Sequence, residues 1–146
     1  MTLEEILEGV TSTTDLPAGT AGRQVAGLDY DSRRVEKDYL FFAFAGAHVD
    51  GGQFASQARD RGAVAVVSEA SRPDGYDGAW IQVAHGRRAR ALAARRFYGA
   101  PDARLGLTAI TGTNGKTTSA YLLDSILRET GHITAMVGTI EYHLAG

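Results

Sequence analysis

An almost wholly apolar run, Tyr-Leu-Phe-Phe-Ala-Phe-Ala at 39–45, constrains the fold of this chain more than any other feature. Polar residues do not alternate with apolar ones along it, as they would in a strand with one face in water. A continuous apolar run is typical of a strand buried on both faces, and such strands occur in sheets covered by helices on both sides. The run therefore predicts an α/β fold.

Periodic segments on either side of the run predict the other elements of this domain. Thr2 and Glu5 have capping-box spacing, and the apolar residues that follow Thr2 recur as on one face of a helix. Gly62 suits the left-handed turn that ends a helix. The resulting pattern predicts a helix-flanked sheet, with helices over 3–10, 53–61 and 87–98 and strands over 25–30, 39–45, 63–67 and 80–83.

Turn residues mark a domain boundary near residue 103. Gly99 and Pro101 end the preceding helix and begin a short turn-rich segment. We therefore assign residues 1–103 to one domain and 104–146 to the start of a second. One βαβ unit cannot cover both faces of a parallel sheet, so we expect the second domain to be incomplete as given. Its expected elements are a strand over 105–110, a loop over 111–116, a helix over 117–129 and a strand over 133–137.

Composition excludes several classes of function. The chain has 146 residues, of which 44% are hydrophobic, and its net charge of −2 argues against a nucleic-acid surface. It has no cysteine, which rules out disulfides and thiolate metal sites. Met1–Val10 has the wrong charge for a signal peptide, and no apolar run approaches the roughly 20 residues that span a bilayer. We expect a cytoplasmic protein, without membrane insertion.

Five arginines lie close together near the end of the predicted first domain, and they allow two interpretations. They could form a face for phosphate or nucleic acid. Because they are interleaved with alanines at helical spacing, we favour the exposed side of an amphipathic helix. The five are Arg87, Arg88, Arg90, Arg95 and Arg96.

The segment Thr-Gly-Thr-Asn-Gly-Lys-Thr-Thr at 111–118 carries the strongest chemical signal. It lacks the first glycine of the usual phosphate-loop pattern but keeps Gly-x-x-Gly-Lys-Thr between a predicted strand and a predicted helix. Gly112 and Gly115 allow successive N–H groups to face one anion, and the helix N-terminus adds a partial positive charge. Lys116 can reach the β- and γ-phosphates of a nucleotide, and the Thr117 hydroxyl can ligate Mg²⁺. The alternative is a glycine-rich turn with a solvated lysine, which the strand–loop–helix context disfavours.

These residues also carry a family resemblance. Gly-Thr-Asn-Gly-Lys-Thr-Thr at 112–118 resembles the ATP-binding loop of the Mur ligases, and Val-Gly-Thr-Ile-Glu-Tyr at 137–142 is similar to the MurE type, UDP-N-acetylmuramoyl-tripeptide synthetase. Asp-Ser-Arg at 31–33 and Gly-Ala-Val-Ala-Val-Val at 62–67 resemble segments of the family's N-terminal domain. The resemblance covers about residues 25–146.

The resemblance implies two sites. The N-terminal domain would bind the UDP end of the substrate, although His48 stands where the family often has glutamine and Gly52 where it often has His or Arg. The UDP-substrate residues would be Tyr30, Ser32, Ala47, His48 and Val49. The ATP-binding residues would be Gly112, Thr113, Asn114, Gly115, Lys116, Thr117 and Thr118, with Lys116 catalytic and Thr117 on the metal.

The implied reaction is an ATP- and Mg²⁺-dependent ligation through an acyl phosphate. It would add a diamino acid, L-lysine or meso-diaminopimelate, to UDP-N-acetylmuramoyl-L-alanyl-D-glutamate in peptidoglycan synthesis. We expect a monomer whose partners are these two substrates and not a nucleic acid. Since the chain would supply only the UDP pocket and the phosphate loop, we expect it to be inactive alone.

Several alternatives share part of the pattern. A MurF-type ligase has both motifs but is less similar at 138–142. Folylpolyglutamate synthase has Gly-Lys-Gly-Ser where this chain has Gly-Lys-Thr-Thr, and it lacks the N-terminal domain. A non-catalytic UDP-sugar-binding module with a remnant loop, or a simple P-loop hydrolase, would also fit the loop.

Overall fold

The computed structural model of the chain describes residues 1–44, 51–138 and 142–143. The chain divides into two compact units, Met1–Leu105 and Gly106–Gly146.

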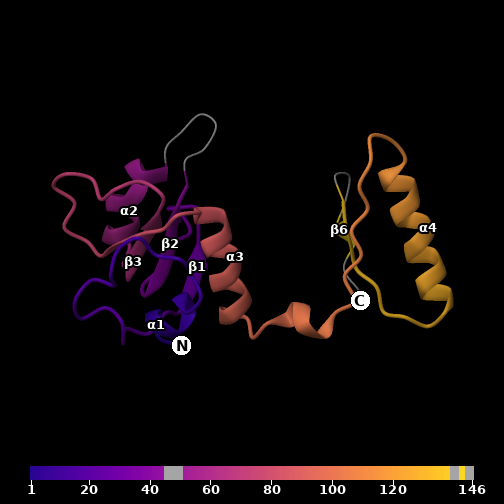
Figure 1. Cartoon of the computed structure of the whole chain (residues 1–146), viewed down its shortest axis with the longest axis horizontal. Coiled ribbons are helices and arrows are strands. Elements are labelled where there is room, and N and C mark those ends of the chain that lie inside the picture. The colour runs from indigo at the N-terminus through magenta and orange to yellow at the C-terminus, as the bar shows by residue number, and fades with distance from the viewer. Residues whose placement is uncertain (45–50, 139–141, 144–146) are drawn as a thin grey trace. The chain divides into compact units, whose positions relative to one another are not determined.

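A four-stranded parallel sheet forms the centre of the first unit (Figure 1). The strands are β1 (Gly27–Asp29), β2 (Tyr39–Ala43), β3 (Ala65–Ser68) and β4 (Trp80–Gln82), and they lie side by side in chain order. Every neighbouring pair is parallel, which confirms the predicted α/β fold. Because the strands run in one direction, their carboxyl ends share one edge of the sheet, where ligands of α/β proteins commonly bind.

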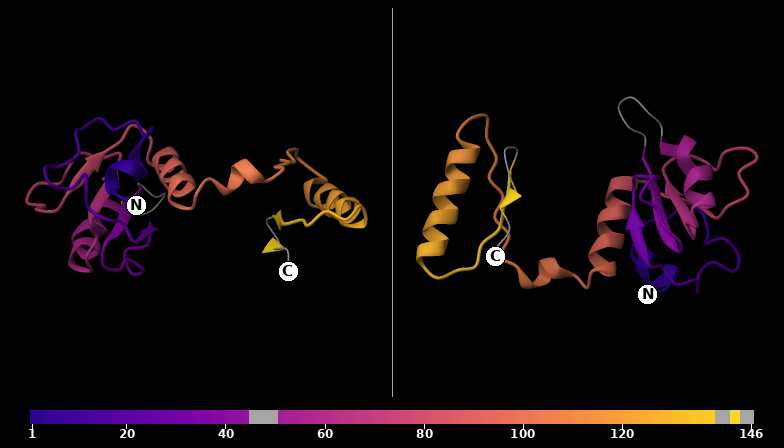
Figure 2. Two further views of the ribbon diagram at one scale, coloured as in Figure 1. Left: turned by 90° about the horizontal axis from the view of Figure 1, so that it is seen from below. Right: turned by 180° about the vertical axis from the view of Figure 1, so that it is seen from behind.

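Helices cover both faces of this sheet (Figure 2). The long helix α3 (Gly86–Phe97) packs with α1 (Leu3–Leu7) over one face, and α2 (Ala55–Asp60) covers the other. Short 3-10 helices lie at Gly51–Phe54 and Pro101–Arg104.

Burial of β2 on both of its faces explains its apolar run. Leu40 and Phe42 pack into the core beneath α1 and α3, whereas Phe41 and Ala43 pack into the core beneath α2. All four are at most 1% exposed. Alternate side chains of a strand point to opposite faces, so only an uninterrupted apolar sequence fills both cores.

Local signals at the helix ends are largely confirmed. Thr2 and Glu5 form both bonds of the capping box, but α1 ends at Leu7, earlier than predicted. Gly9, two residues further on, has a φ of +79°, and an α-helix cannot continue through a residue with this left-handed backbone angle. Gly62 has the expected positive φ, +98°, and its N–H donates to Arg59 O at 2.8 Å.

The second unit contains the helix α4 (Lys116–Glu129), as predicted, and a short antiparallel pair, β5 (Met136–Val137) and β6 (Tyr142–His143). The predicted strand over 105–110 is wrong, because the structure gives these residues no strand. A strand exists only through bonds to a neighbour, and no described strand pairs with this segment. The predicted parallel βαβ arrangement is therefore not formed, and β5 pairs with β6 instead.

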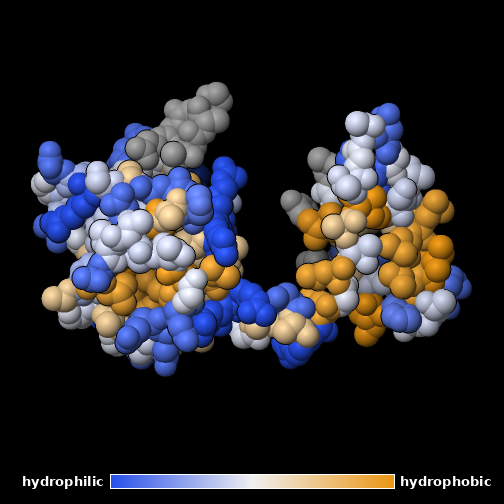
Figure 3. Space-filling model, viewed as in Figure 1, coloured by the Kyte–Doolittle hydropathy of each residue, from blue (hydrophilic) through white to orange (hydrophobic). Residues whose placement is uncertain are grey.

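Apolar side chains of the second unit face solvent (Figure 3). None of its described residues is buried, in contrast to the two cores of the first unit. The exposed large side chains are Leu107, Tyr121, Leu122, Ile126, Ile133 and Val137. Within the part of the chain that the structure describes, no helix combines the length and apolar character that crossing a membrane requires.

Candidate functional site

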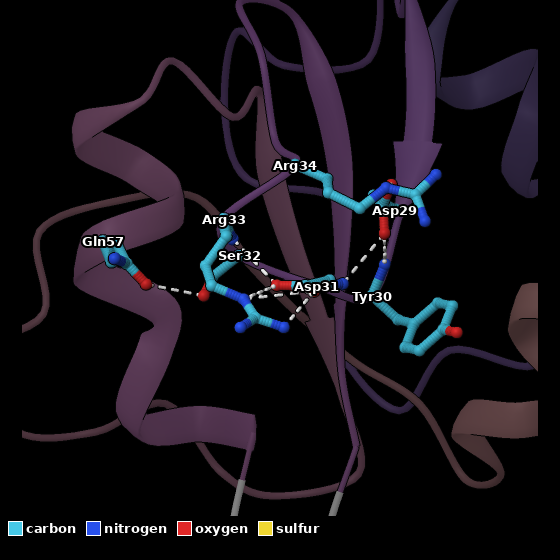
Figure 4. Close-up of polar contacts among 7 residues, drawn as sticks. All are labelled: Asp29, Tyr30, Asp31, Ser32, Arg33, Arg34 and Gln57. Carbon is cyan, nitrogen blue, oxygen red and sulfur yellow. Dashed lines mark hydrogen bonds and ion pairs between the residues drawn. The ribbon is translucent and has the colours of Figure 1, made fainter.

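A buried carboxylate organises the turn that follows β1 (Figure 4). Asp29 is the last residue of β1, and its Oδ1 accepts hydrogen bonds from the N–H groups of Tyr30 at 2.8 Å and Asp31 at 2.9 Å. Its Oδ2 lies 3.2 Å from Arg34 Nε. These contacts satisfy a charge that would be costly to bury alone, and they fix the backbone that carries the predicted site residues.

Ser32 lies in this turn but is only 6% exposed. Its hydroxyl donates a 2.6 Å hydrogen bond to Gln57 Oε1 on α2 (Figure 4). The hydroxyl proton is thus committed to Gln57, while the lone pairs of Oγ can still accept a bond. Gln57 is 25 residues away along the chain, and no local sequence pattern identifies it.

Arg33 and Asp31 form a two-pronged ion pair on the surface of the turn. Arg33 Nε lies 2.9 Å from Asp31 Oδ1, and Nη2 lies 2.7 Å from Oδ2. The hydrogen bond from the Arg33 side chain, helped by the Arg33 backbone N–H, lowers the pKa of Asp31 from 3.8 to about 2. The same pairing raises the pKa of Arg33. Because each charge neutralises the other, this pair stabilises the turn and does not offer a free charge to a ligand.

Tyr30 is the exposed aromatic residue of the turn, with 52% of its surface accessible. The guanidinium carbon of Arg90, on α3, lies 4.1 Å from the centre of its ring. The sequence places Arg90 among solvated helix arginines, but the structure brings it to the same turn as Ser32. The 60-residue separation explains why periodicity could not reveal this contact.

The other predicted UDP-substrate residues, Ala47, His48 and Val49, lie outside the described residues. The residues that flank them are held together, since Gly51 N donates to Phe44 O at 2.8 Å. A Cβ on Gly51 would lie 2.6 Å from that same oxygen, so the contact requires glycine. Phe44 directly follows β2, which pairs in parallel with β1, and it therefore leaves the sheet at the same edge as Tyr30.

The predicted phosphate loop leads into α4. Gly115 is the N-cap residue, with a φ of +76°, and Gly112 has a φ of +150°. Both values favour glycine. No described side chain caps α4, so the first N–H groups of the helix lack a side-chain partner among the residues that the structure describes. Such N–H groups at a helix N-terminus suit an anion.

Lys116 bends back over this loop. Its Nζ donates to Gly112 O at 2.5 Å and lies 3.4 Å from Thr113 O. Asn114 lies in the same exposed loop, and Thr117 and Thr118 belong to the first turn of α4. The structure therefore brings all seven predicted ATP-binding residues into one loop and helix start, with an ammonium group on top of them.

Two cavities of the first unit lie away from the predicted residues. One of about 260 Å³ lies between the segment that follows α1 and the first half of α3, and it is lined by Val10, His85, Arg88 and Leu92. Another, of about 470 Å³, includes Arg59. Neither is lined by Tyr30 or Ser32.

Comparison with known families matches both units. The Mur ligase family, catalytic domain, matches residues 24–98, just over half of the chain, and the Mur ligase middle domain matches residues 110–145. The chain belongs to the Mur ligase family. This confirms the resemblance seen in the phosphate loop and in the N-terminal segments.

Individual Mur ligases agree with this assignment. UDP-N-acetylmuramoyl-L-alanyl-D-glutamate--2,6-diaminopimelate ligase of Solibacter usitatus is 60% identical over 146 residues, which is all of this chain and 30% of the relative. A solved structure of a ligase with that name is 26% identical, with a TM-score of 0.74, covering 97% of this chain and 28% of that one. A MurF ligase from Thermotoga maritima in complex with ADP is 25% identical, with a TM-score of 0.56, covering 78% and 26%. The chain thus spans about 30% of the length of the curated relative.

Proposed function

We propose that this chain supplies the UDP-substrate-binding and ATP-phosphate-binding parts of a ligase that joins 2,6-diaminopimelate to UDP-N-acetylmuramoyl-L-alanyl-D-glutamate. The observation that carries the proposal is the Gly112–Thr118 loop at the start of α4, in a chain 60% identical to a ligase named for this reaction. That name favours diaminopimelate over lysine, which the sequence left open. We assign UDP-substrate binding to residues 1–103 and ATP binding to 104–146.

In the proposed reaction, the γ-phosphoryl group of ATP passes to the D-glutamate carboxylate, giving an acyl phosphate and ADP. The diaminopimelate amine then attacks the acyl carbon, loses a proton, and expels inorganic phosphate as the amide forms. Lys116 would offset the negative charge that develops on the transferred phosphoryl oxygens. Because ATP is a reactant, we place the reaction in the cytoplasm.

The geometry of the loop supports this role for its residues. The positive φ angles of Gly112 and Gly115 let the chain wrap closely around a phosphate, and Thr113 and Asn114 lie between these two glycines. Lys116 Nζ is now held by backbone carbonyl oxygens, which are weaker partners for a cation than phosphate oxygens. We expect the phosphates of a bound nucleotide to become the main partner of Lys116 Nζ. We expect the backbone N–H of Thr118, in the same helical turn, to face these phosphates too.

Thr117 fits a role in binding Mg²⁺. Mg²⁺ prefers hard oxygen ligands and commonly takes only one or two from the protein, with phosphate oxygens and water completing its shell. The Thr117 hydroxyl is such a ligand, in the first turn of α4. Mg²⁺ would supply positive charge that offsets the negative charge of the phosphates.

The turn after β1 supports the UDP end of the proposal. Tyr30 and Ser32 lie at the carboxyl edge of a parallel sheet, the usual ligand edge of such folds. The hydroxyl of Ser32 can only accept a further bond, so it would suit an N–H donor such as N3–H of uracil. Ala47, His48 and Val49 remain in the proposed site on the strength of the family resemblance.

Calorimetry on the 146-residue chain tests whether it binds the UDP-linked substrate. We expect UDP-N-acetylmuramoyl-L-alanyl-D-glutamate to bind without ATP, and Ser32→Ala to weaken binding about fivefold, as one hydrogen bond of about 1 kcal/mol implies. Ser56→Ala, at an exposed position of α2, is the matched control and should bind as the wild type does. Unchanged binding by Ser32→Ala would remove Ser32 from the site, and no binding by the wild type would contradict the UDP assignment.

A further inference from the structure

Arg90 differs from the two arginines at the end of α3 and from the two arginines of the turn after β1. Arg95 and Arg96 are paired with carboxylates, at 2.7 Å from Asp102 and 2.5 Å from Glu8. In the turn, Arg33 and Arg34 are paired with Asp31 and Asp29. Arg90 is half-buried, yet among the described residues no carboxylate lies within ion-pair distance of it.

The contact that holds Arg90 leaves its charge available. Its guanidinium lies over the Tyr30 ring, 4.1 Å from the centre, an arrangement in which the face of the ring attracts the cation. This contact holds the guanidinium against the ring but uses none of its five N–H donors in an ion pair. A half-buried cation held against an aromatic ring, without a neutralising carboxylate among the residues that the structure describes, is suited to bind an anion from outside the chain.

The position of Arg90 identifies which anion. Tyr30 is the first residue after β1, two residues before Ser32, so the guanidinium lies at the sheet edge of the proposed UDP site. The two carboxylates of this turn already have partners other than Arg90. Asp29 binds Arg34 and two backbone N–H groups, and Asp31 binds Arg33.

We propose that Arg90 binds the diphosphate of the UDP-linked substrate, and that Tyr30 is the positioning residue that orients its guanidinium. This inference rests on the proposed function. The diphosphate is the most highly charged part of that substrate, and a planar guanidinium can form two parallel hydrogen bonds to phosphate oxygens. Arg90 would thus distinguish UDP-linked substrates from an uncharged uridine.

The test compares a ligand that has the diphosphate with one that lacks it. UDP-N-acetylmuramoyl-L-alanyl-D-glutamate is titrated calorimetrically into the 146-residue chain, and uridine is measured by competition. We expect Arg90→Gln to weaken binding of the UDP substrate at least tenfold and to change uridine binding less than twofold. The matched control is Arg88→Gln, which removes the same charge from the opposite flank of α3, where Arg88 lines the cavity with Val10 and Leu92.

Variants of Tyr30 test the positioning role. Tyr30→Phe keeps the ring under the guanidinium and should bind the UDP substrate within about twofold of wild type, since the ring face supplies the attraction. Tyr30→Leu removes the ring, and we expect it to weaken the UDP substrate more than uridine.

Three results separate the possible failures. If the wild type binds the UDP substrate and Arg90→Gln binds it equally well, the proposal for Arg90 is wrong while the UDP assignment stands. Equal losses for the UDP substrate and uridine in Arg90→Gln would also overturn it, because a disturbed turn affects both ligands. If the wild type binds neither ligand, the UDP assignment itself fails and this inference fails with it.

Discussion

The buried hydroxyl of Ser32 donates a 2.6 Å hydrogen bond to Gln57, and this bond ties the turn after β1 to α2. Gln57 is exposed, so its amide can be hydrated if the bond is lost, whereas Ser32 has little access to water. The two partners are therefore unequal. Loss of the glutamine leaves a buried polar group without a partner, which is the more costly change.

This inequality makes Gln57→Ala a test of the turn. We expect the variant to lower the free energy of unfolding by about 1–3 kcal/mol, the range for a buried polar group left unsatisfied. Ser56→Ala on the same helix should change it by less than about 0.5 kcal/mol, as is usual for exposed positions. Urea unfolding followed by circular dichroism measures both. Equal stabilities of the two variants would show that the Ser32–Gln57 bond does not hold the turn.

At Gly51, the edge of the proposed site depends on the absence of a Cβ atom. A Cβ there would lie 2.6 Å from Phe44 O and 2.7 Å from Phe44 N, so the backbone must move. We expect Gly51→Ala to destabilise the first unit by about 1–3 kcal/mol, the usual cost of an overpacked position. Gly22→Ala is the control, because nothing lies within 4 Å of a Cβ at Gly22. A thermal midpoint for Gly51→Ala that matches the control would contradict the close approach of Phe44 and Gly51.

The Asp31–Arg33 pair predicts a specific pH dependence. Arg33 lowers the pKa of Asp31 to about 2, below its ordinary value of 3.8. A carboxylate with a lowered folded-state pKa stabilises the fold above its unfolded pKa, and this contribution is lost as the pH falls toward 2. We expect an NMR titration of the Asp31 carboxyl carbon to have its midpoint near 2, and Arg33→Ala to move it up toward 3.8. A midpoint near 3.8 in the wild type would show that the pair is not formed in solution.

Sequence patterns predicted the fold of the first unit because its signals are local. The run at 39–45 predicted a strand buried on both faces, and the structure buries Leu40 and Phe41 in opposite cores. The capping residues Thr2 and Glu5 and the helix-ending Gly62 were also correct, since each acts within a few residues of its own position. Helix and strand ends were less accurate, by one to three residues in most elements.

What the sequence could not predict depends on contacts between distant residues. The segment 105–110 has the composition of a strand, but pairing decides whether a strand forms, and it has no described partner. Gln57 and Arg90 reach the turn after β1 from α2 and α3, and nothing in their own segments marks them. The phosphate-loop residues were predicted from their local pattern and Ser32 from the family resemblance, and both stay predictions. The contacts of Gln57 with Ser32 and of Arg90 with Tyr30 required the structure.

The central claim is that this chain carries a nucleotide-phosphate loop that is separate from its UDP-substrate turn. Lys116→Ala tests it most directly, with Lys37→Ala, at the only other lysine of the chain, as the control for lost charge. ATP with Mg²⁺ and UDP-N-acetylmuramoyl-L-alanyl-D-glutamate are each titrated into the wild type and both variants.

We expect Lys116→Ala to weaken ATP binding by about 10- to 150-fold, the equivalent of a charge-assisted contact of roughly 1.5–3 kcal/mol. Its affinity for the UDP substrate should stay within about twofold of wild type, because sites without shared partners are nearly independent. Lys37→Ala should leave both affinities unchanged. ATP binding that survives in Lys116→Ala, or UDP-substrate binding that falls in step with ATP binding, would contradict the two-site account.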